Sequence, residues 1–129
     1  MSRTPDDLRY SSTHQWARLG ADGLVVVGIT DHAQEALGDV LFCELPAVGA
    51  RFSAGEQSGT VESLKSVSEV YAPVSGEVVA QNAVLGITPE RVNEDPYGEG
   101  WFYALRPENP AELDALLDAA GYAALAGGA

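Results

Sequence analysis

Residues 59–79 read GTVESLKSVSEVYAPVSGEVV, and this stretch decides the fold. Its β-branched residues come in short runs between glycine, serine and proline, which is typical of strands joined by tight turns. Apolar residues also recur at every third position from Val61 to Val70, a spacing that weakly favours a helix. Because serine and β-branched residues suit strands and turns better than helices, we predict a strand, a reversal at Leu64–Lys65 and a returning strand.

The first 110 residues continue this β pattern, with a turn signal roughly every ten residues. The runs of apolar and alternating residues predict four further strands, at 23–29, 39–45, 77–80 and 101–105. Prolines 46 and 107 end two of these strands, because proline cannot donate to a strand ladder.

Two helices are predicted between and after these strands. The first has Thr30 or Asp31 as its N-cap and ends at Gly38. The second begins with Asn109 as its cap and Pro110 at the first helical position.

Within the second helix, Glu112 stands three residues after the cap, where it is expected to close a capping box. Four apolar residues at helical spacing follow, namely Leu113, Leu116, Leu117 and Ala120. Gly121 is expected to end this helix, and the tail 123–129 is expected to fray.

The length of 129 residues predicts one domain, 1–129, with its core between about residues 8 and 122. A net charge of −12 argues against nucleic acid and against anionic membrane surfaces as partners. No apolar run has the length of a membrane span, and the first residues lack the features of a signal or transit peptide. With a single cysteine, we expect a cytoplasmic protein, although a processed organellar form would look the same.

Residues suited to catalysis or to metal binding are few. His14 stands beside Trp16, where a structural hydrogen bond is expected rather than a role as a base, and Cys43 is expected to be a buried apolar side chain. The acidic loop 92–101 lacks the alternate-residue pattern of a calcium loop, so we expect a solvated turn. We therefore predict neither a catalytic residue nor a metal site.

Lys65 is the only lysine of the chain, since the other six cationic residues are arginines. A lysine is a compact amine that can be acylated, whereas a guanidinium is always charged and a poor nucleophile. The residues alone leave two interpretations open: an exposed turn lysine of no special role, or a modified lysine at a hairpin tip. Glu62 and Glu69 flank this lysine and are placed to orient the hairpin against a basic enzyme surface.

Several stretches together identify the chain as similar to a known family. In order they are STHQW, VGITDHAQEALGDVLFCELP, GTVESLKSVSEVYAPVSGEVV, RVNEDPYGEGW and NPAELDALLDAAGY, and they cover most of residues 8–122. The sequence closely resembles the glycine cleavage system H protein family, the lipoyl carriers of that system. ESLKS matches the segment that is lipoylated in this family, and Lys65 takes the position of the lipoyl-lysine.

The resemblance implies a mainly β fold, a barrel-sandwich hybrid with a short internal helix and a C-terminal helix. It implies lipoate joined to the Lys65 amine as an amide, and a carrier that is not itself an enzyme. Glu62, Ser63 and Glu69 become candidates for recognition by the modifying enzyme, and Gln15 and His32 become candidates for docking of the lipoyl arm.

The resemblance also implies the partners. A PLP-dependent glycine decarboxylase (the P-protein) loads an aminomethyl group, and an aminomethyltransferase (the T-protein) passes the one-carbon unit to tetrahydrofolate. A flavin dihydrolipoyl dehydrogenase (the L-protein) reoxidises the dithiol, and lipoate-attachment enzymes install the cofactor. We expect the carrier to be a monomer.

One departure from the family pattern concerns the arm. The family commonly has glutamate between the histidine and tryptophan of STHQW, where this chain has Gln15. A carboxylate there can pair with a cationic aminomethyl group, whereas an amide can only form hydrogen bonds. We therefore expect weaker electrostatic protection of the loaded arm.

Two other functions would also use Lys65. A biotin carrier has the same fold, but its lysine is flanked by methionines, and here Leu64 and Ser66 are the neighbours. A lipoate-relay protein, which donates lipoyl groups to other enzymes, would use the same Lys65, and one sequence does not separate it from a glycine cleavage carrier.

Overall fold

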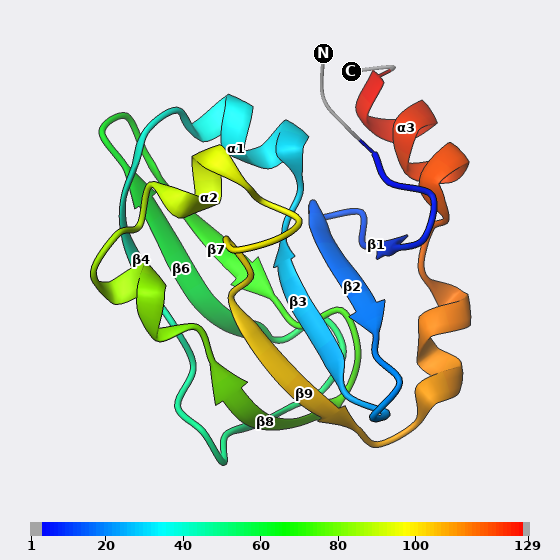
Figure 1. Ribbon diagram of the computed structural model, residues 1–129. Helices are drawn as coiled ribbons and strands as arrows, with labels where there is room; N and C mark the ends of the chain where they lie inside the picture. The colour runs from blue at the N-terminus through cyan, green and yellow to red at the C-terminus, as the bar shows by residue number, and fades with distance from the viewer. Residues whose placement is uncertain (1–3, 128–129) are drawn as a thin grey trace.

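Two β sheets form the protein, for which the computed structural model describes residues 4–127. Six antiparallel strands make the larger sheet, in the order β1 (Arg9–Tyr10), β2 (Gln15–Leu19), β3 (Val25–Ile29), β9 (Tyr103–Pro107), β8 (Gly76–Gln81) and β5 (Arg51–Phe52). Three antiparallel strands make the smaller sheet, in the order β4 (Val40–Glu44), β6 (Gln57–Ser63) and β7 (Val67–Tyr71). Figure 1 shows the sheets wrapped around a common interior.

The main core lies between these sheets and consists mostly of β-branched residues. Val25, Val27 and Ile29 of β3 are at most 2% exposed, and so are Val61 and Val70 of the smaller sheet. β-branched side chains pack well on a pleated surface, so the valine-rich runs supply both strand propensity and core volume. The arrangement is a barrel-sandwich hybrid, and the predicted fold class is confirmed.

Five of the sequence predictions are confirmed at the level of single elements, the last of them with shifted bounds. The lysine segment is a hairpin of β6 and β7, in which Glu62 lies opposite Val67, and the chain reverses over residues 64–66. The predicted strands at 23–29, 39–45 and 77–80 correspond to β3, β4 and β8. The strand expected at 101–105 is β9, shifted to Tyr103–Pro107.

The internal helix is also confirmed. Helix α1 covers Asp31–Leu37, and the side chain of Thr30 accepts a hydrogen bond from the Ala33 N–H at 3.2 Å, which makes Thr30 the N-cap. Gly38 closes the helix with φ of 79°, a value that glycine adopts without steric cost. Two shorter helical segments follow later in the chain: η1 (Ala83–Gly86), which is a 3-10 helix, and α2 (Arg91–Glu94).

The prediction for the C-terminal region was wrong in its boundaries. A 3-10 helix, η2, covers Pro110–Ala115 after an Asn109 cap, and the chain is extended at Leu116. Leu117 then forms a bridge with Tyr10, in which each backbone N–H donates to the other residue's carbonyl at 2.8 Å. Helix α3 covers Ala119–Gly127, so Gly121 lies inside a helix. The tail 123–129, expected to fray, is helical as far as Gly127, and residues 128–129 lie outside the described residues.

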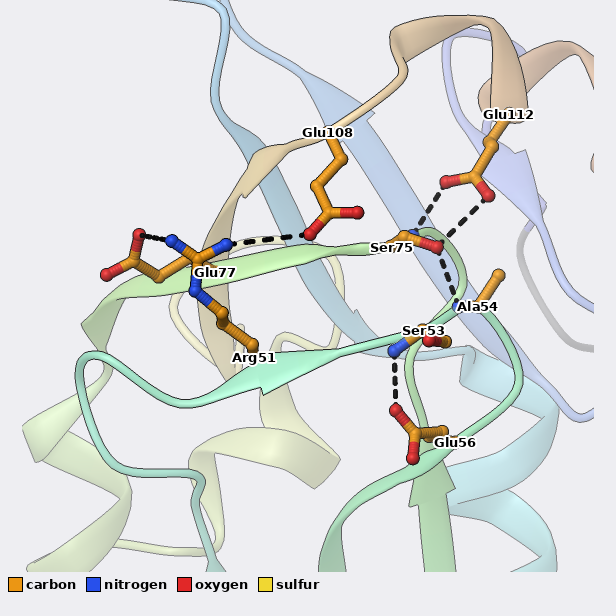
Figure 2. Close-up of polar contacts among 8 residues, drawn as sticks. All are labelled: Arg51, Ser53, Ala54, Glu56, Ser75, Glu77, Glu108 and Glu112. Atoms are coloured by element: carbon orange, nitrogen blue, oxygen red, sulfur yellow. Dashed lines mark hydrogen bonds and ion pairs between the residues drawn. The ribbon is translucent and has the colours of Figure 1, made fainter.

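Glu112 does not close the expected capping box. Its carboxylate oxygens accept hydrogen bonds from the Ser75 backbone N–H at 2.7 Å and from the Ser75 hydroxyl at 3.1 Å (Figure 2). Ser75 Oγ in turn accepts from the Ala54 N–H at 3.0 Å. Glu112 therefore ties η2 to the start of β8 rather than capping its own helix.

The loop 92–101, expected to be a solvated turn, is largely packed into the fold. Val92, Pro96 and Tyr97 are buried, and the Trp16 indole N–H donates to the Pro96 carbonyl at 2.8 Å. Trp16 itself lies so close to Gly28 that a Cβ atom there would be 2.7 Å from the indole ring. The loop thus belongs to a second apolar cluster and is not a mobile acidic surface.

This second cluster joins the C-terminal helix to the edge of the larger sheet. Its buried members come from both ends of the chain: Leu8, Tyr10, Trp16, Tyr97 and Tyr122. The rings of Tyr10 and Tyr122 are stacked with centroids 4.8 Å apart. Within residues 4–127, no helix has the length and apolar character needed to cross a membrane.

Candidate functional site

The hairpin turn that carries Lys65 is held by the serines on either side of it. The Ser63 N–H donates to the Ser66 carbonyl at 2.8 Å and closes the turn. Ser63 Oγ accepts from the backbone N–H groups of Lys65 at 3.3 Å and of Ser66 at 3.2 Å. Small polar side chains of this kind stabilise a tight turn by bonding to the backbone nearby. The turn is therefore built by local sequence, and Lys65 and Leu64 project from it as exposed residues.

The Lys65 side chain extends across the end of α1. A Cβ atom at Gly38 would lie 3.2 Å from Lys65 Cε and 3.6 Å from its Nζ. A side chain at this position would crowd the flexible lysine stem and push it slightly aside. The same position also needs the positive φ that glycine tolerates. Gly38 thus ends helix α1 and also leaves space for the Lys65 side chain. Figure 1 shows the hairpin tip and α1 at the same end of the molecule.

Asn93 fixes the backbone beneath this contact, a role that sequence reasoning missed. Its amide N–H groups donate to the Gly38 carbonyl at 2.8 Å and to Gln34 Oε1 at 2.9 Å. Its side-chain oxygen accepts from the Val40 N–H at 2.9 Å. One asparagine on α2 therefore holds the junction of α1 and β4 on which Lys65 rests. The sequence carried no local sign of this, because the partners lie more than fifty residues away.

A cavity of about 220 Å³ opens beside the hairpin. Three segments supply its walls: the loop before β2, helix α1 and the hairpin strands. The lining residues are Thr13, His14, Gln15, Ile29, His32, Ala33, Ala36, Leu37, Val61, Ser66, Ser68 and Glu69. Three of the predicted site residues, Gln15, His32 and Glu69, are thus brought together in one place within reach of the lysine turn.

The other predicted recognition residues lie outside that cavity. Glu62 is exposed on β6, opposite Val67, and Ser63 is occupied in the turn. Leu64 and Val67 beside them are 82% and 60% exposed, which places apolar surface next to the lysine. Exposed apolar side chains around a charged residue are suited to contact with another protein.

Gln15 lines the cavity, but its amide is already engaged by neighbouring groups. Its side chain is buried, and Oε1 accepts from the Ser11 hydroxyl at 3.0 Å and from the Thr13 hydroxyl. Its Nε2 donates to the Thr13 carbonyl at 2.9 Å. Gln15 therefore organises the loop before β2, and its Oε1 already accepts two hydrogen bonds from the protein itself.

Two histidines, His14 and His32, line this cavity and lie close to each other. The rings of His14 and His32 have centroids 5.0 Å apart. Burial lowers the pKa of His14 below its ordinary value of 6.5, and the neighbouring His32 lowers it further. His14 Nδ1 lies 2.7 Å from the Tyr122 hydroxyl, a contact between residues 108 positions apart.

Other candidate chemistry is weak within the described residues. Cys43 is buried in β4, and this burial raises the pKa of its thiol to about 12, so it stays protonated and unreactive at neutral pH. The part of the chain that the structure describes holds no group of three or more His, Cys, Asp or Glu side chains arranged for a metal. The site thus offers one accessible amine beside a polar cavity, which suits acylation and docking of an attached group.

Comparisons with known proteins agree with this geometry. The family model described as glycine cleavage H-protein matches residues 8–127. A glycine cleavage system H protein 2 of Pseudomonas aeruginosa is 60% identical over 124 residues, covering 96% of this chain and 95% of that protein. Its namesake in Pseudomonas putida is 61% identical over 127 residues, covering 98% and 99%. A crystal structure of a glycine cleavage system H protein from Mycobacterium marinum superposes with a TM-score of 0.86 at 45% identity, covering 95% of this chain and 98% of that one.

Proposed function

The chain belongs to the glycine cleavage H-protein family, and from this membership we propose that Lys65 is the residue that carries its lipoyl group. Members of this family are lipoyl-bearing shuttles of the glycine cleavage system, with lipoate covalently attached to a lysine. The protein is a carrier rather than a catalyst. Its partners in the system are the glycine decarboxylase, the aminomethyltransferase and the dihydrolipoyl dehydrogenase, the P-, T- and L-proteins of the system.

The single observation that carries the assignment is the position of the chain's only lysine. Lys65 is exposed at the tip of the β6–β7 hairpin, on a turn built by Ser63 and Ser66. An amide with lipoate needs a free amine that an attachment enzyme can reach, and this amine meets that requirement. When attached, lipoate supplies a dithiolane that accepts the aminomethyl cargo while it is reduced. A tethered group meets each partner at an effective concentration set by the arm rather than by diffusion.

We propose that attachment enzymes recognise the hairpin as a shape together with its two flanking carboxylates. Ser63 preserves the shape, since its hydroxyl oxygen accepts from two backbone N–H groups of the turn. Glu62 and Glu69 are exposed on the two strands that lead to and from the lysine. Carboxylates at these positions guide a basic enzyme surface mainly by raising the encounter rate.

The cavity beside the hairpin is proposed as the docking place of the loaded arm. His32 and Glu69 line it, and Glu69 is the carboxylate among its lining residues. A carboxylate there suits the cationic amine of the cargo, because the two opposite charges attract each other. Gln15 supports this wall through the loop before β2.

We also propose a monomeric single domain that works in the cytoplasm. The high net charge of −12 opposes self-association, and Cys43 is a free thiol, as suits a reducing compartment. Light scattering coupled to gel filtration tests the oligomeric state, and cell fractionation tests the location. One cooperative transition in chemical unfolding is expected for the single domain.

Intact-mass spectrometry tests the central assignment. The parent and a Lys65→Arg variant are expressed in a host with lipoylation machinery and added lipoate. One lipoyl group on the parent and none on the variant is the expected result. A parent that gains no mass, a biotinyl mass, or a variant that is still modified contradicts the assignment.

Glycine–bicarbonate exchange with a P-protein then separates the shuttle from a lipoate relay. The lipoylated parent is expected to support the exchange, and the Lys65→Arg variant is not. Glu62→Gln and Glu69→Gln variants are expected to be lipoylated more slowly, whereas Glu77→Gln, on the distant strand β8, provides a charge-matched control.

A further inference from the structure

The C-terminal helix reaches the wall of the cavity through one buried side chain, Tyr122. This residue is 1% exposed, and its hydroxyl lies 2.7 Å from His14 Nδ1 and 2.7 Å from Thr30 Oγ1. Its ring is stacked on that of Tyr10. The hydroxyl therefore joins three segments: helix α3, the loop before β2 and the N-cap of α1.

The direction of these hydrogen bonds follows from counting protons. Thr30 is fully buried, and its hydroxyl oxygen already accepts the Ala33 N–H as the cap of α1. A hydroxyl has one hydrogen to donate, and within residues 4–127 the other partner of Thr30 Oγ1 is the Tyr122 oxygen. A buried donor without an acceptor is costly, so Thr30 donates to Tyr122.

The same count fixes the second bond. The hydrogen of the Tyr122 hydroxyl is then directed to His14 Nδ1, which must accept it. An imidazole that accepts at Nδ1 is neutral and carries its proton on Nε2. Protonation of His14 at Nδ1 would break this bond, in agreement with the lowered pKa that burial gives this residue.

The backbone of His14 is also fixed by hydrogen bonds. His14 adopts φ of 73°, which is unusual for a residue with a side chain. Its N–H donates to the Ser11 carbonyl at 3.1 Å, and its own carbonyl accepts the Thr30 N–H at 3.0 Å. Strained backbone persists only where the surroundings over-determine it, and such positions concentrate at functional sites.

We propose that Tyr122 is a positioning residue of the cavity, which fixes His14 as a neutral imidazole with its proton on Nε2 through a relay from Thr30. His14 thereby offers the arm an uncharged N–H donor and adds no positive charge beside the cationic cargo. This inference rests on the proposed docking of the arm in the cavity. The inference gives the C-terminal helix a role beside the cavity, although this helix is far from Lys65 in the sequence.

The charged and titratable groups that face His14 come from three elements. His32 on α1 lies against its ring, Tyr122 on α3 contacts Nδ1, and Glu69 on β7 lines the same cavity. Burial and the neighbouring His32 both lower the pKa of His14. The relay acts in the same direction, because the Tyr122 hydroxyl occupies Nδ1 and opposes its protonation.

Long-range ¹H–¹⁵N NMR of the imidazoles tests the proposal in protein without lipoate, so its outcome is independent of the lysine assignment. The chain has two histidines, and a His32→Gln variant assigns their signals. The comparison uses the parent, Tyr122→Phe and Tyr10→Phe. The control keeps the stacked ring pair and removes a hydroxyl that donates to the Pro5 carbonyl instead.

The parent and Tyr10→Phe are expected to show His14 with its proton on Nε2 and a pKa below 6.5. In Tyr122→Phe, His14 is expected to exchange between tautomers, and its pKa is expected to rise. In lipoylated protein loaded with cargo, Tyr122→Phe should shorten the lifetime of the loaded form, and Tyr10→Phe should not.

Three results would overturn the proposal: a proton on Nδ1 of His14 in the parent, a Tyr122→Phe variant with unchanged tautomer and pKa, or an equal change in both variants. The tautomer of His14 measured in the parent still tests the proposal if a variant fails to fold. Failure of lipoylation in the mass experiment would instead contradict the lysine assignment and leave the tautomer result standing.

Discussion

Gly38 combines a positive φ, which is strained for any other residue, with a close approach of the end of the Lys65 side chain. Gly38→Ala is expected to destabilise the protein by about 1–3 kcal/mol, the usual cost of such backbone strain. The new methyl group would also displace Lys65 Cε from its contact at 3.2 Å. Urea unfolding measures the first effect, and the rate of lipoylation measures the second.

Gly86→Ala is the matched control for this substitution. Gly86 lies in η1, and a Cβ atom there would meet nothing within 4 Å. A surface change of this kind is expected to alter stability by no more than about 0.5 kcal/mol. Equal losses in the two variants would mean that neither the positive φ of Gly38 nor its contact with Lys65 is responsible.

Gln15→Glu tests the departure from the family pattern. A carboxylate at this position is expected to slow loss of the cationic cargo from the loaded arm, because it can pair with the amine. It would also face the Thr13 carbonyl, to which the Gln15 amide now donates, so a small loss of stability is expected as well. The release of ammonia from the loaded protein measures the first effect, and an unchanged rate would contradict it.

The roles of single residues could be predicted from the sequence where their contacts are local. The Lys65 turn was predictable because Ser63 and Ser66 act within a few residues of the lysine. Asn93 and Tyr122 were not, because their importance depends on partners more than fifty and about one hundred residues away. A single sequence gives no sign of such pairs until the fold brings them together.

Among the elements, the C-terminal region shows where local helix signals fail. The cap at Asn109 and the apolar spacing after it favour one continuous helix, yet the backbone bridge of Leu117 with Tyr10 interrupts it. A tertiary hydrogen bond to a strand thus overrides helix propensity, which is a weak preference. Asp118 restarts the helix, since its side chain accepts from the Gly121 N–H at 2.8 Å.

Glu112 is expected to matter for the attachment of η2 to the sheet. Glu112→Gln would replace a carboxylate that accepts two hydrogen bonds from Ser75 with an amide that can accept only one well (Figure 2). A loss of about 1–2 kcal/mol in the free energy of unfolding is expected, as for hydrogen bonds to a charged group. Chemical denaturation with urea provides the measurement.

Glu108→Gln is the control within the same surface. Glu108 forms an exposed ion pair with Arg51 at 3.6 Å, which Figure 2 also shows. Exposed ion pairs contribute about 0–1 kcal/mol, so this variant should be close to the parent in stability. A larger loss for Glu108→Gln than for Glu112→Gln would contradict the role given to Ser75.

For the whole molecule, buried tyrosines predict how the fold responds to alkali. Burial raises the pKa of Tyr10, Tyr103 and Tyr122 above the ordinary value of 10. Groups whose pKa is higher in the folded state stabilise it fully below pH 10, and this contribution is lost as the pH rises further. Stability should therefore fall above pH 10, where the unfolded chain ionises first.

Absorbance of tyrosinate and far-UV circular dichroism across an alkaline titration check this expectation. The ionisation of the buried tyrosines is expected to coincide with the loss of β structure. Full ionisation of all five tyrosines in a chain that keeps its circular dichroism would contradict it.

The mainly β class was predictable from the residues, because valine-rich runs alternate with turn residues. The barrel-sandwich hybrid followed only from the resemblance to the H-protein family. What the residues alone left open was the pairing of the lysine segment as helix or hairpin. That choice is made by the interior, where Val61 and Val70 of the hairpin are buried against β3. A helix would not place both residues there with the lysine outside.

With lipoate on Lys65, as proposed, the exposed turn also lets proteolysis report how much of the carrier is lipoylated. A protease that cuts only after unmodified lysine has one target in this chain, on a surface turn that it can reach without unfolding the protein. Molecules with an unmodified Lys65 would yield two pieces, 1–65 and 66–129, whereas acylated molecules would remain whole. The ratio of cut to uncut chain on a gel thus reports the fraction of the protein whose Lys65 is acylated.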